Sequence, residues 1–125
     1  MMKPKVIAAA IGQCVHVAGL DHFLQLCERN GWEAMSLGPA VPPERILAAI
    51  EEEVPTMVAV SYRLTADDAA PLFDFLKKGA ESIQVPQPRW VFGGTLPVAE
   101  VARKSGLFER VFDGTEPPEE VEAFI

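Results

Sequence analysis

The chain has 125 residues, 49% of them hydrophobic, and a formal net charge of −7. This size and apolar content fit one compact domain with a single core, so we expect residues 1–125 to form one domain. Acidic charge without clustered Lys and Arg argues against a nucleic-acid partner. No apolar run is long enough to cross a membrane, and the two cysteines are expected to be free thiols in a reducing, cytoplasmic compartment.

Five short apolar runs alternate along the chain with segments of helical spacing. The runs are Val6 to Ile11, Ala34 to Leu37, Met57 to Val60, Trp90 to Phe92 and Val111 to Phe112. Helical spacing is seen over residues 20–27, 46–50 and 69–76. Most runs lack strict polar alternation, which is typical of strands covered on both faces. The pattern predicts an α/β, doubly wound, flavodoxin-like fold: a five-stranded parallel sheet in the order 2-1-3-4-5 with helices on both faces.

Local signals mark several of the expected helix ends. Pro42-Pro43 is expected to begin the second helix. Thr65 and Asp68 have the spacing of a capping box, although an Asp occupies the position where Glu or Gln is usual. The last segment, residues 115–125, is expected to begin a helix behind two prolines and then stops. This abrupt end is consistent with an N-terminal fragment of a longer protein.

In such a sheet a ligand binds outside the carboxyl ends of the strands, near the point where strand order reverses. This rule selects three loops, at residues 12–19, 61–65 and 93–97. The first loop has no Ser or Thr for a flavin phosphate and no acidic residues for a phosphoreceiver site. Neither a dinucleotide-binding glycine motif nor a phosphate-binding lysine loop is present.

The three loops nevertheless contain groups that suit a binding site. His16 carries an imidazole, which is a common metal ligand and proton-transfer group. Ser61 offers a small hydroxyl, and the pair Gly93-Gly94 allows a ligand to approach the backbone closely. The other histidine, His22, is expected on the solvated side of the first helix.

Three motifs in these loops together resemble a known family. They are Cys14-Val-His16-Val-Ala-Gly19, Ser61-Tyr62-Arg63 and Gly93-Gly94. In order and spacing they are similar to the DxHxxG, SxL and GG motifs of the cobalamin-binding domain of corrinoid-dependent methyltransferases of the methionine synthase type. Forty-one residues separate the first motif from the second, which is similar to the family interval.

The resemblance implies that the domain holds a base-off corrinoid. His16 would replace the cofactor's own base as the lower ligand of cobalt, and Ser61 would hydrogen-bond that displaced base. Gly19, Gly93 and Gly94 would make room for the nucleotide tail, whose cavity the first strand and the neighbouring helix would line. The implied cofactor-binding set is Cys14, His16, Gly19, Ser61, Tyr62, Arg63, Thr65, Gly93 and Gly94, with His16 as the metal ligand.

The sequence departs from the family motifs at two positions. Cys14 occupies the place of the family's Asp, and a neutral thiol is a weaker hydrogen-bonding partner than a carboxylate. We therefore expect weaker bonding of His16 to cobalt, or a state with this histidine off cobalt. An alternative hypothesis is that Cys14 itself approaches cobalt. Arg63 replaces the family's Leu and brings a charge that pairs with the corrin or its phosphate, or else faces solvent.

The function implied by the resemblance is that of a methyl-group carrier, which depends on a methyltransferase partner or an attached domain and is not catalytic alone. A second interpretation is a non-catalytic cobalamin carrier or sensor module. A third is a degenerate domain that no longer binds the cofactor. A zinc site formed by Cys14, His16 and Cys27 is a remote fourth, because it lacks another ligand.

Overall fold

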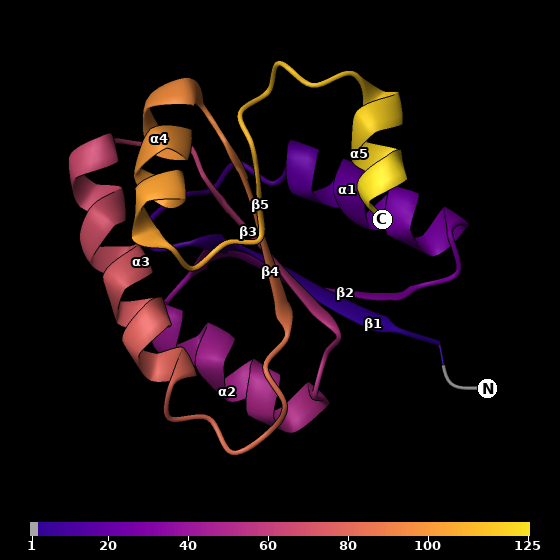
Figure 1. The fold of residues 1–125 in the computed structure, drawn as a ribbon, viewed down its shortest axis with the longest axis horizontal. Helices are drawn as coiled ribbons and strands as arrows, with labels where there is room; N and C mark the ends of the chain where they lie inside the picture. Colours follow the sequence, from indigo (N-terminus) through magenta and orange to yellow (C-terminus); the bar gives the residue numbers. More distant parts are fainter. Residues whose placement is uncertain (1–2) are drawn as a thin grey trace.

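The computed structural model describes residues 3–125. Its strands are β1 (Lys5–Ile11), β2 (Glu33–Val41), β3 (Met57–Tyr62), β4 (Arg89–Gly94) and β5 (Arg110–Phe112). Its helices are α1 (Ala18–Arg29), α2 (Pro43–Glu53), α3 (Ala66–Ala80), α4 (Leu96–Ser105) and α5 (Pro118–Phe124). All strand pairs are parallel, and the strand order is 2-1-3-4-5 (Figure 1). The predicted flavodoxin-like fold is therefore confirmed.

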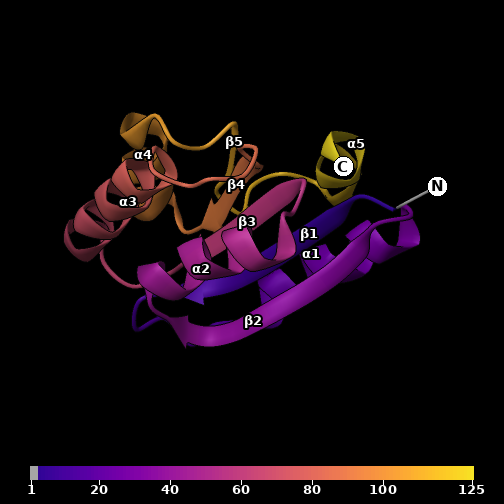
Figure 2. The same cartoon turned by 90° about the horizontal axis from the view of Figure 1, so that it is seen from below.

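The helices cover the two faces of the sheet unequally. Helices α2, α3 and α4 lie on one face, and α1 and α5 lie on the other (Figures 1 and 2). Each face has its own cluster of buried hydrophobic residues, and all six residues of β3 are buried. Because successive side chains point to opposite faces of a strand, Ser61 faces α1 and α5, whereas Tyr62 faces the three-helix side.

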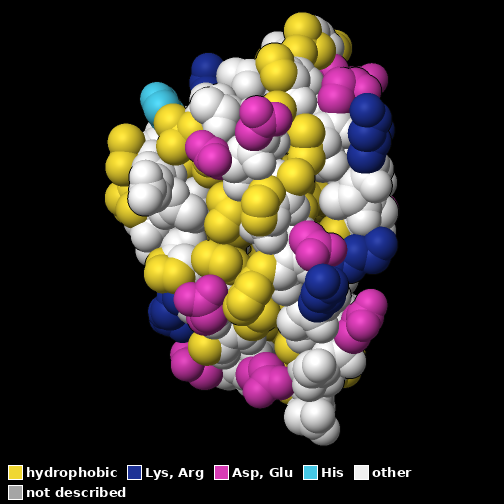
Figure 3. Space-filling model, turned by 90° about the vertical axis from the view of Figure 1, so that its left-hand side faces the viewer, with side chains coloured by type: hydrophobic (Ala, Val, Ile, Leu, Met, Phe, Trp, Pro, Cys, Tyr) yellow, Lys and Arg dark blue, Asp and Glu magenta, His cyan; other side chains and the backbone are white. Residues whose placement is uncertain are grey.

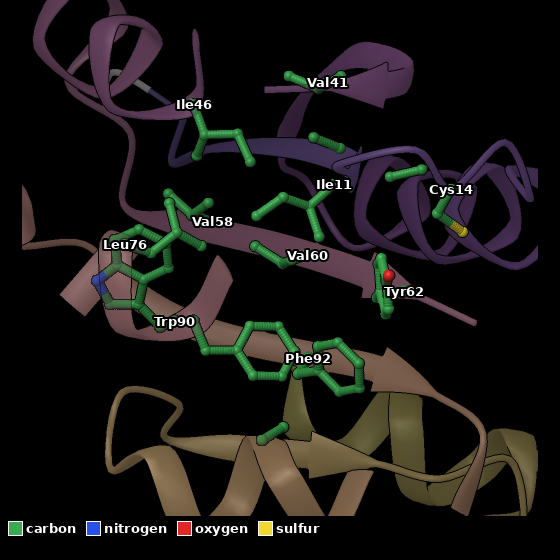
Figure 4. Packing of buried hydrophobic residues seen from close by; sticks show 14 of the residues in the cluster. Ile11, Cys14, Val41, Ile46, Val58, Val60, Tyr62, Leu76, Trp90 and Phe92 are labelled. Carbon is green, nitrogen blue, oxygen red and sulfur yellow. The ribbon is translucent and has the colours of Figure 1, made fainter. Parts of the chain in front are cut away.

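The larger core lies on the three-helix side (Figure 4). Phe73, Phe92 and Phe108 form edge-to-face or tilted ring contacts there, with ring centroids 5.2 to 5.4 Å apart. Cys14 and Tyr62 belong to the same cluster and are fully or almost fully buried. The loop after β1 is therefore anchored in this core, on the face opposite to α1.

The outer surface of the three-helix side is less polar than the net charge suggests. Hydrophobic side chains gather along the middle of the face over α3 and α4, with charged side chains around them (Figure 3). Phe75 of α3 is 45% exposed. The outer side of α3 and α4 is therefore partly apolar, in addition to the apolar side that packs against the sheet.

The local signals behave largely as expected. Pro43 is the first residue of α2, and Pro118 is the first residue of α5. Thr65 caps α3, because its Oγ1 accepts a hydrogen bond from the backbone N–H of Asp68 at 3.3 Å. The Asp68 carboxylate accepts from the Thr65 hydroxyl at 2.8 Å and does not reach back to a backbone N–H. The shorter side chain of Asp explains this departure from the usual capping box.

The regular elements extend further into the three predicted loops than the sequence indicates. Gly19 lies in the first turn of α1, Ser61 is within β3, and Gly93-Gly94 ends β4. Helix α4 was implied only by the strict alternation of strands and helices. These site residues are consequently placed by helix and strand geometry and do not depend on loop conformation.

Candidate functional site

A cavity of about 320 Å³ lies between α1 and α5, over the carboxyl halves of β3 and β4. This volume is at the lower end of the range of about 300–1,000 Å³ that is typical of small-molecule sites. Its wall includes Leu20, Phe23 and Leu26 of α1; Ala59, Ser61, Val91 and Gly93 of the sheet; Phe112; and Pro118 and Val121 of α5. Most lining residues are hydrophobic or glycine, so the cavity suits a flat apolar group with few polar atoms.

Ser61 supplies a hydroxyl with no partner at the sheet side of this cavity. The residue is 9% exposed, and its Oγ makes no hydrogen bond within residues 3–125. Among the described residues, the other buried side-chain atom without a partner is Nε1 of Trp90, which lies in the core on the opposite face. A buried hydroxyl without a partner is unfavourable by about 1–3 kcal/mol. Ser61 is therefore a donor and acceptor available to a ligand in the cavity.

The two adjacent glycines at the end of β4 have different roles. A Cβ atom built on Gly93 meets no atom within 4 Å, because it projects toward the cavity. A Cβ atom built on Gly94 would lie 2.5 Å from the backbone oxygen of Tyr62 and 2.8 Å from the Phe92 ring. Packing of the protein itself thus requires glycine at position 94. No neighbouring atom among residues 3–125 requires it at 93, where a side chain would reduce the cavity.

His16 is exposed in the loop between β1 and α1, and it lines the cavity. The Sγ atom of Cys14 lies 3.5 Å from its Nδ1. Cys14 itself is fully buried in the core of the three-helix side and does not line the cavity. Cys14 therefore reaches the site only through His16.

Of the remaining predicted site residues, two line the cavity and two do not. Gly19 and Arg63 line the cavity. Arg63 is exposed, and within residues 3–125 no carboxylate pairs with it. Tyr62 points into the opposite core and Thr65 caps α3, so neither lines the cavity. Burial raises the pKa of the Tyr62 phenol, and the carboxylate of Asp68 adds to this shift.

The loop after β5 forms a wall that the motifs did not indicate. Oδ1 of Asp113 accepts hydrogen bonds from the backbone and hydroxyl of Thr115, and its Oδ2 accepts from Arg103 at 3.0 Å. These bonds, with that of Thr115 first, hold the pKa of the Asp113 carboxyl well below its usual range. The Glu116 carboxylate accepts from the backbone N–H groups of Asp113 and Gly114. The Asp-Gly-Thr sequence is a turn signal, but only the fold shows that this turn borders a cavity.

Two expectations about the site are corrected. No residue of β1 lines the cavity, so the first strand does not form its wall, although the neighbouring helix α1 does. The zinc hypothesis fails because Cys14 and Cys27 lie on opposite faces of the sheet. In the described part of the chain, no three His, Cys, Asp or Glu side chains are grouped to hold a metal ion.

No helix among residues 3–125 is both long and apolar enough to cross a membrane.

The fold and the cavity together define a doubly wound α/β domain with a ligand site at the carboxyl edge of its sheet. The family model of the B12 binding domain matches residues 4–122. The chain therefore belongs to the B12-binding domain family, which confirms the resemblance seen in its motifs. No curated protein matches the sequence.

Solved structures with this fold include proteins of cobalamin systems. A cobalamin-binding protein from Desulfitobacterium hafniense DCB-2 is 25% identical, with a TM-score of 0.75 over 97% of this chain and 57% of its own. The methanol:cobalamin methyltransferase complex of Methanosarcina barkeri is 22% identical, with a TM-score of 0.72 over 99% of this chain and 47% of its own. The chain thus spans about half the length of either.

A response-regulator receiver domain from Methylobacillus flagellatus also matches. It is 13% identical, with a TM-score of 0.65 over 98% of this chain and 96% of its own. At this identity the likeness concerns the fold alone. The architecture is therefore shared with proteins of another function, and only the residues at the carboxyl edge can distinguish them.

Proposed function

We propose that the domain binds cobalamin, with the nucleotide tail in the cavity between α1 and α5 and the corrin ring over the carboxyl edge of the sheet. The observation that carries the proposal is the unpartnered hydroxyl of Ser61, buried at the side of a mostly apolar cavity. A planar heterocyclic base with a few nitrogen atoms fits this combination of apolar walls and one hydroxyl. Membership in the B12-binding family supports the choice of ligand.

Residues of three elements would hold the tail. Ser61 would hydrogen-bond the base, while Phe23 of α1 and Val121 of α5 would pack against it. Gly93 would leave the space that the tail needs. At about 320 Å³ the cavity has room for part of a large cofactor only, so the rest of the ligand must lie outside it.

The edge of the sheet offers a surface for that remaining part. Val15, Leu64 and Leu96 are 62%, 42% and 54% exposed, and they follow β1, β3 and β4 respectively. Because the carboxyl ends of parallel strands meet at one edge, these side chains border the same region as His16. Exposed apolar groups gathered beside an imidazole suit a corrin ring whose cobalt accepts a nitrogen ligand.

A bound corrinoid supplies methyl transfer at cobalt, while the protein supplies binding, orientation and control of the ligand below the metal. The domain would then be a methyl carrier that needs a methyltransferase partner or an attached domain. The similar fold within the methanol:cobalamin methyltransferase complex supports this role.

The test is retention of cobalamin by the purified protein. It is incubated with hydroxocobalamin or methylcobalamin, freed of excess cofactor by gel filtration, and examined by ultraviolet-visible spectroscopy. We expect stoichiometric retention, reduced in Ser61→Ala but unchanged in the matched surface variant Ser82→Ala. A His16→Ala variant reports separately on the lower ligand. A chain that is folded but retains no cofactor would contradict the proposal and favour a degenerate domain.

A further inference from the structure

The side chain of Cys14 is held in a fixed position beside His16. Its backbone N–H donates to the carbonyl of Ile11 at 3.3 Å, and its carbonyl accepts from the N–H of Ala40 at 2.8 Å. The side chain is 0% exposed, and His16 is its only hydrogen-bonding partner within residues 3–125, with 3.5 Å between Sγ and Nδ1. A contact anchored in this way acts on His16 whenever the loop is in its folded conformation.

The chemistry of the two groups favours one direction of this hydrogen bond. A neutral imidazole carries one ring proton, on Nδ1 or on Nε2, and the unprotonated nitrogen is a good acceptor. A thiol is a weak donor and also only a weak acceptor. Donation from S–H to Nδ1 uses the imidazole nitrogen as acceptor, whereas donation from Nδ1–H to sulfur would use the thiol, which is the weaker acceptor of the two.

We propose that Cys14 is a positioning residue that keeps neutral His16 in the tautomer protonated on Nε2. A metal ion binds the lone pair of a ring nitrogen, and in this tautomer Nε2 has none to offer. Nδ1 does have a lone pair, but it is directed to the Cys14 thiol. His16 is then a conditional ligand, because binding through Nε2 requires this hydrogen bond to break first.

The change of tautomer needs no redox partner. The proton on Nε2 passes to water, a proton from water binds Nδ1, and the thiol keeps its own proton while turning away. The exposure of His16 permits both transfers. A carboxylate at position 14 would have the opposite effect, because it can only accept, and it would favour Nδ1–H with a free lone pair on Nε2. This consequence for cobalt rests on the proposed function, but the tautomer itself does not.

The tautomer is measured in the cofactor-free protein. Two-bond ¹H–¹⁵N correlation spectra of ¹⁵N-histidine-labelled protein, recorded well above the ordinary imidazole pKa of about 6.5, identify the protonated nitrogen of each ring. His22 is exposed, lines the cavity and makes no side-chain hydrogen bond within the described residues, so in the cofactor-free protein it serves as the internal reference. We expect His16 to be protonated on Nε2 to a greater extent than His22. Protonation of His16 mainly on Nδ1 in the unaltered protein overturns the proposal.

Variants at position 14 give a second test. Cys14→Asp should shift His16 toward Nδ1–H, and Cys14→Ala should bring it to the tautomer ratio of His22, while His22 itself does not change. If Cys14→Asp does not fold, the comparison of Cys14→Ala with the unaltered protein still shows whether Cys14 controls the tautomer of His16. An unchanged His16 tautomer in the folded Ala variant excludes control by Cys14.

The cobalt consequence is read from electron paramagnetic resonance of the protein loaded with cob(II)alamin. Nitrogen splitting that changes on ¹⁵N-histidine labelling identifies histidine below cobalt. We expect little of it in the unaltered protein and more in Cys14→Asp. If both proteins show equal histidine splitting, Cys14 does not control the binding of His16 to cobalt, and this part of the proposal is wrong. Failure to retain cobalamin overturns the proposed function instead and leaves the tautomer result valid.

Discussion

Replacing Gly93 by valine is expected to separate ligand binding from folding. The structure leaves open space where a side chain at position 93 would project, and Gly93 does not have a left-handed backbone. Glycine in a strand is less favourable than alanine by about 0.5–1 kcal/mol, and valine has a high strand propensity. We therefore expect Gly93→Val to keep or raise the free energy of unfolding, by up to about 1 kcal/mol.

The same substitution should weaken cobalamin binding strongly. Three carbon atoms would enter a cavity of about 320 Å³ beside Ser61, where the nucleotide tail is proposed to lie. Forcing extra carbon atoms into a filled site is unfavourable by about 1–3 kcal/mol. This range corresponds to affinity that is lower by about 5- to 150-fold.

Gly94→Ala is the matched control for this prediction. Its Cβ would lie 2.5 Å from the backbone oxygen of Tyr62, so we expect it to destabilise the fold by about 1–3 kcal/mol. Urea unfolding followed by circular dichroism gives the stabilities, and equilibrium titration with hydroxocobalamin gives the affinities. If Gly93→Val destabilises as much as Gly94→Ala, or binds cobalamin as tightly as the unaltered protein, the assignment of the cavity to the tail is wrong.

Four other predictions concern single side chains. Ser61→Ala should raise the free energy of unfolding of the cofactor-free protein by about 1 kcal/mol, because it removes an unpartnered hydroxyl, and should weaken cobalamin binding about three- to tenfold; urea unfolding and titration measure both. Arg63→Gln should weaken binding by no more than about fivefold, and only at low salt, because an exposed charge pair contributes about 0.2–1 kcal/mol and is screened. Val54→Gly should stabilise the fold by about 1 kcal/mol in thermal unfolding, since this valine has φ 47° and is 49% exposed. Burial raises the pKa of the Cys27 thiol to about 12. The unfolded chain then binds fewer protons than the folded one above pH 9, so stability should fall toward pH 12 by up to about 1.4 kcal/mol per pH unit, and the slope should be smaller in Cys27→Ala.

The sequence predicted the fold well because its central strands β1 and β3 are buried on both faces. The run Met57 to Val60 has no alternation, and each of its residues is buried in the structure. Helix starts were found where proline fixes the backbone, as at Pro43 and Pro118. Strand ends were predicted less well, because Ser and Gly are common in turns, yet Ser61 and Gly93 continue the sheet.

The site was predicted only in part, because motif spacing does not give side-chain direction or the position of distant elements. Ser61 and Tyr62 are adjacent in one motif, yet strand geometry sends them to opposite faces of the sheet. Val121 and Glu116 reach the cavity from the end of the chain, and nothing in their local sequence indicates a binding role. Their contribution depends on α5 packing beside α1, which is a property of the whole fold.

This domain shares its fold with a receiver domain, so the character of the site must come from particular side chains. A cavity exists here because Ala59, Ser61 and Gly93 are small residues on one face of neighbouring strands, where larger side chains would pack directly against α1 and α5. The same positions with bulky residues would preserve the sheet and remove the cavity. The proposed binding would therefore depend on side-chain volume at a few sheet positions, whereas the fold alone does not select a ligand.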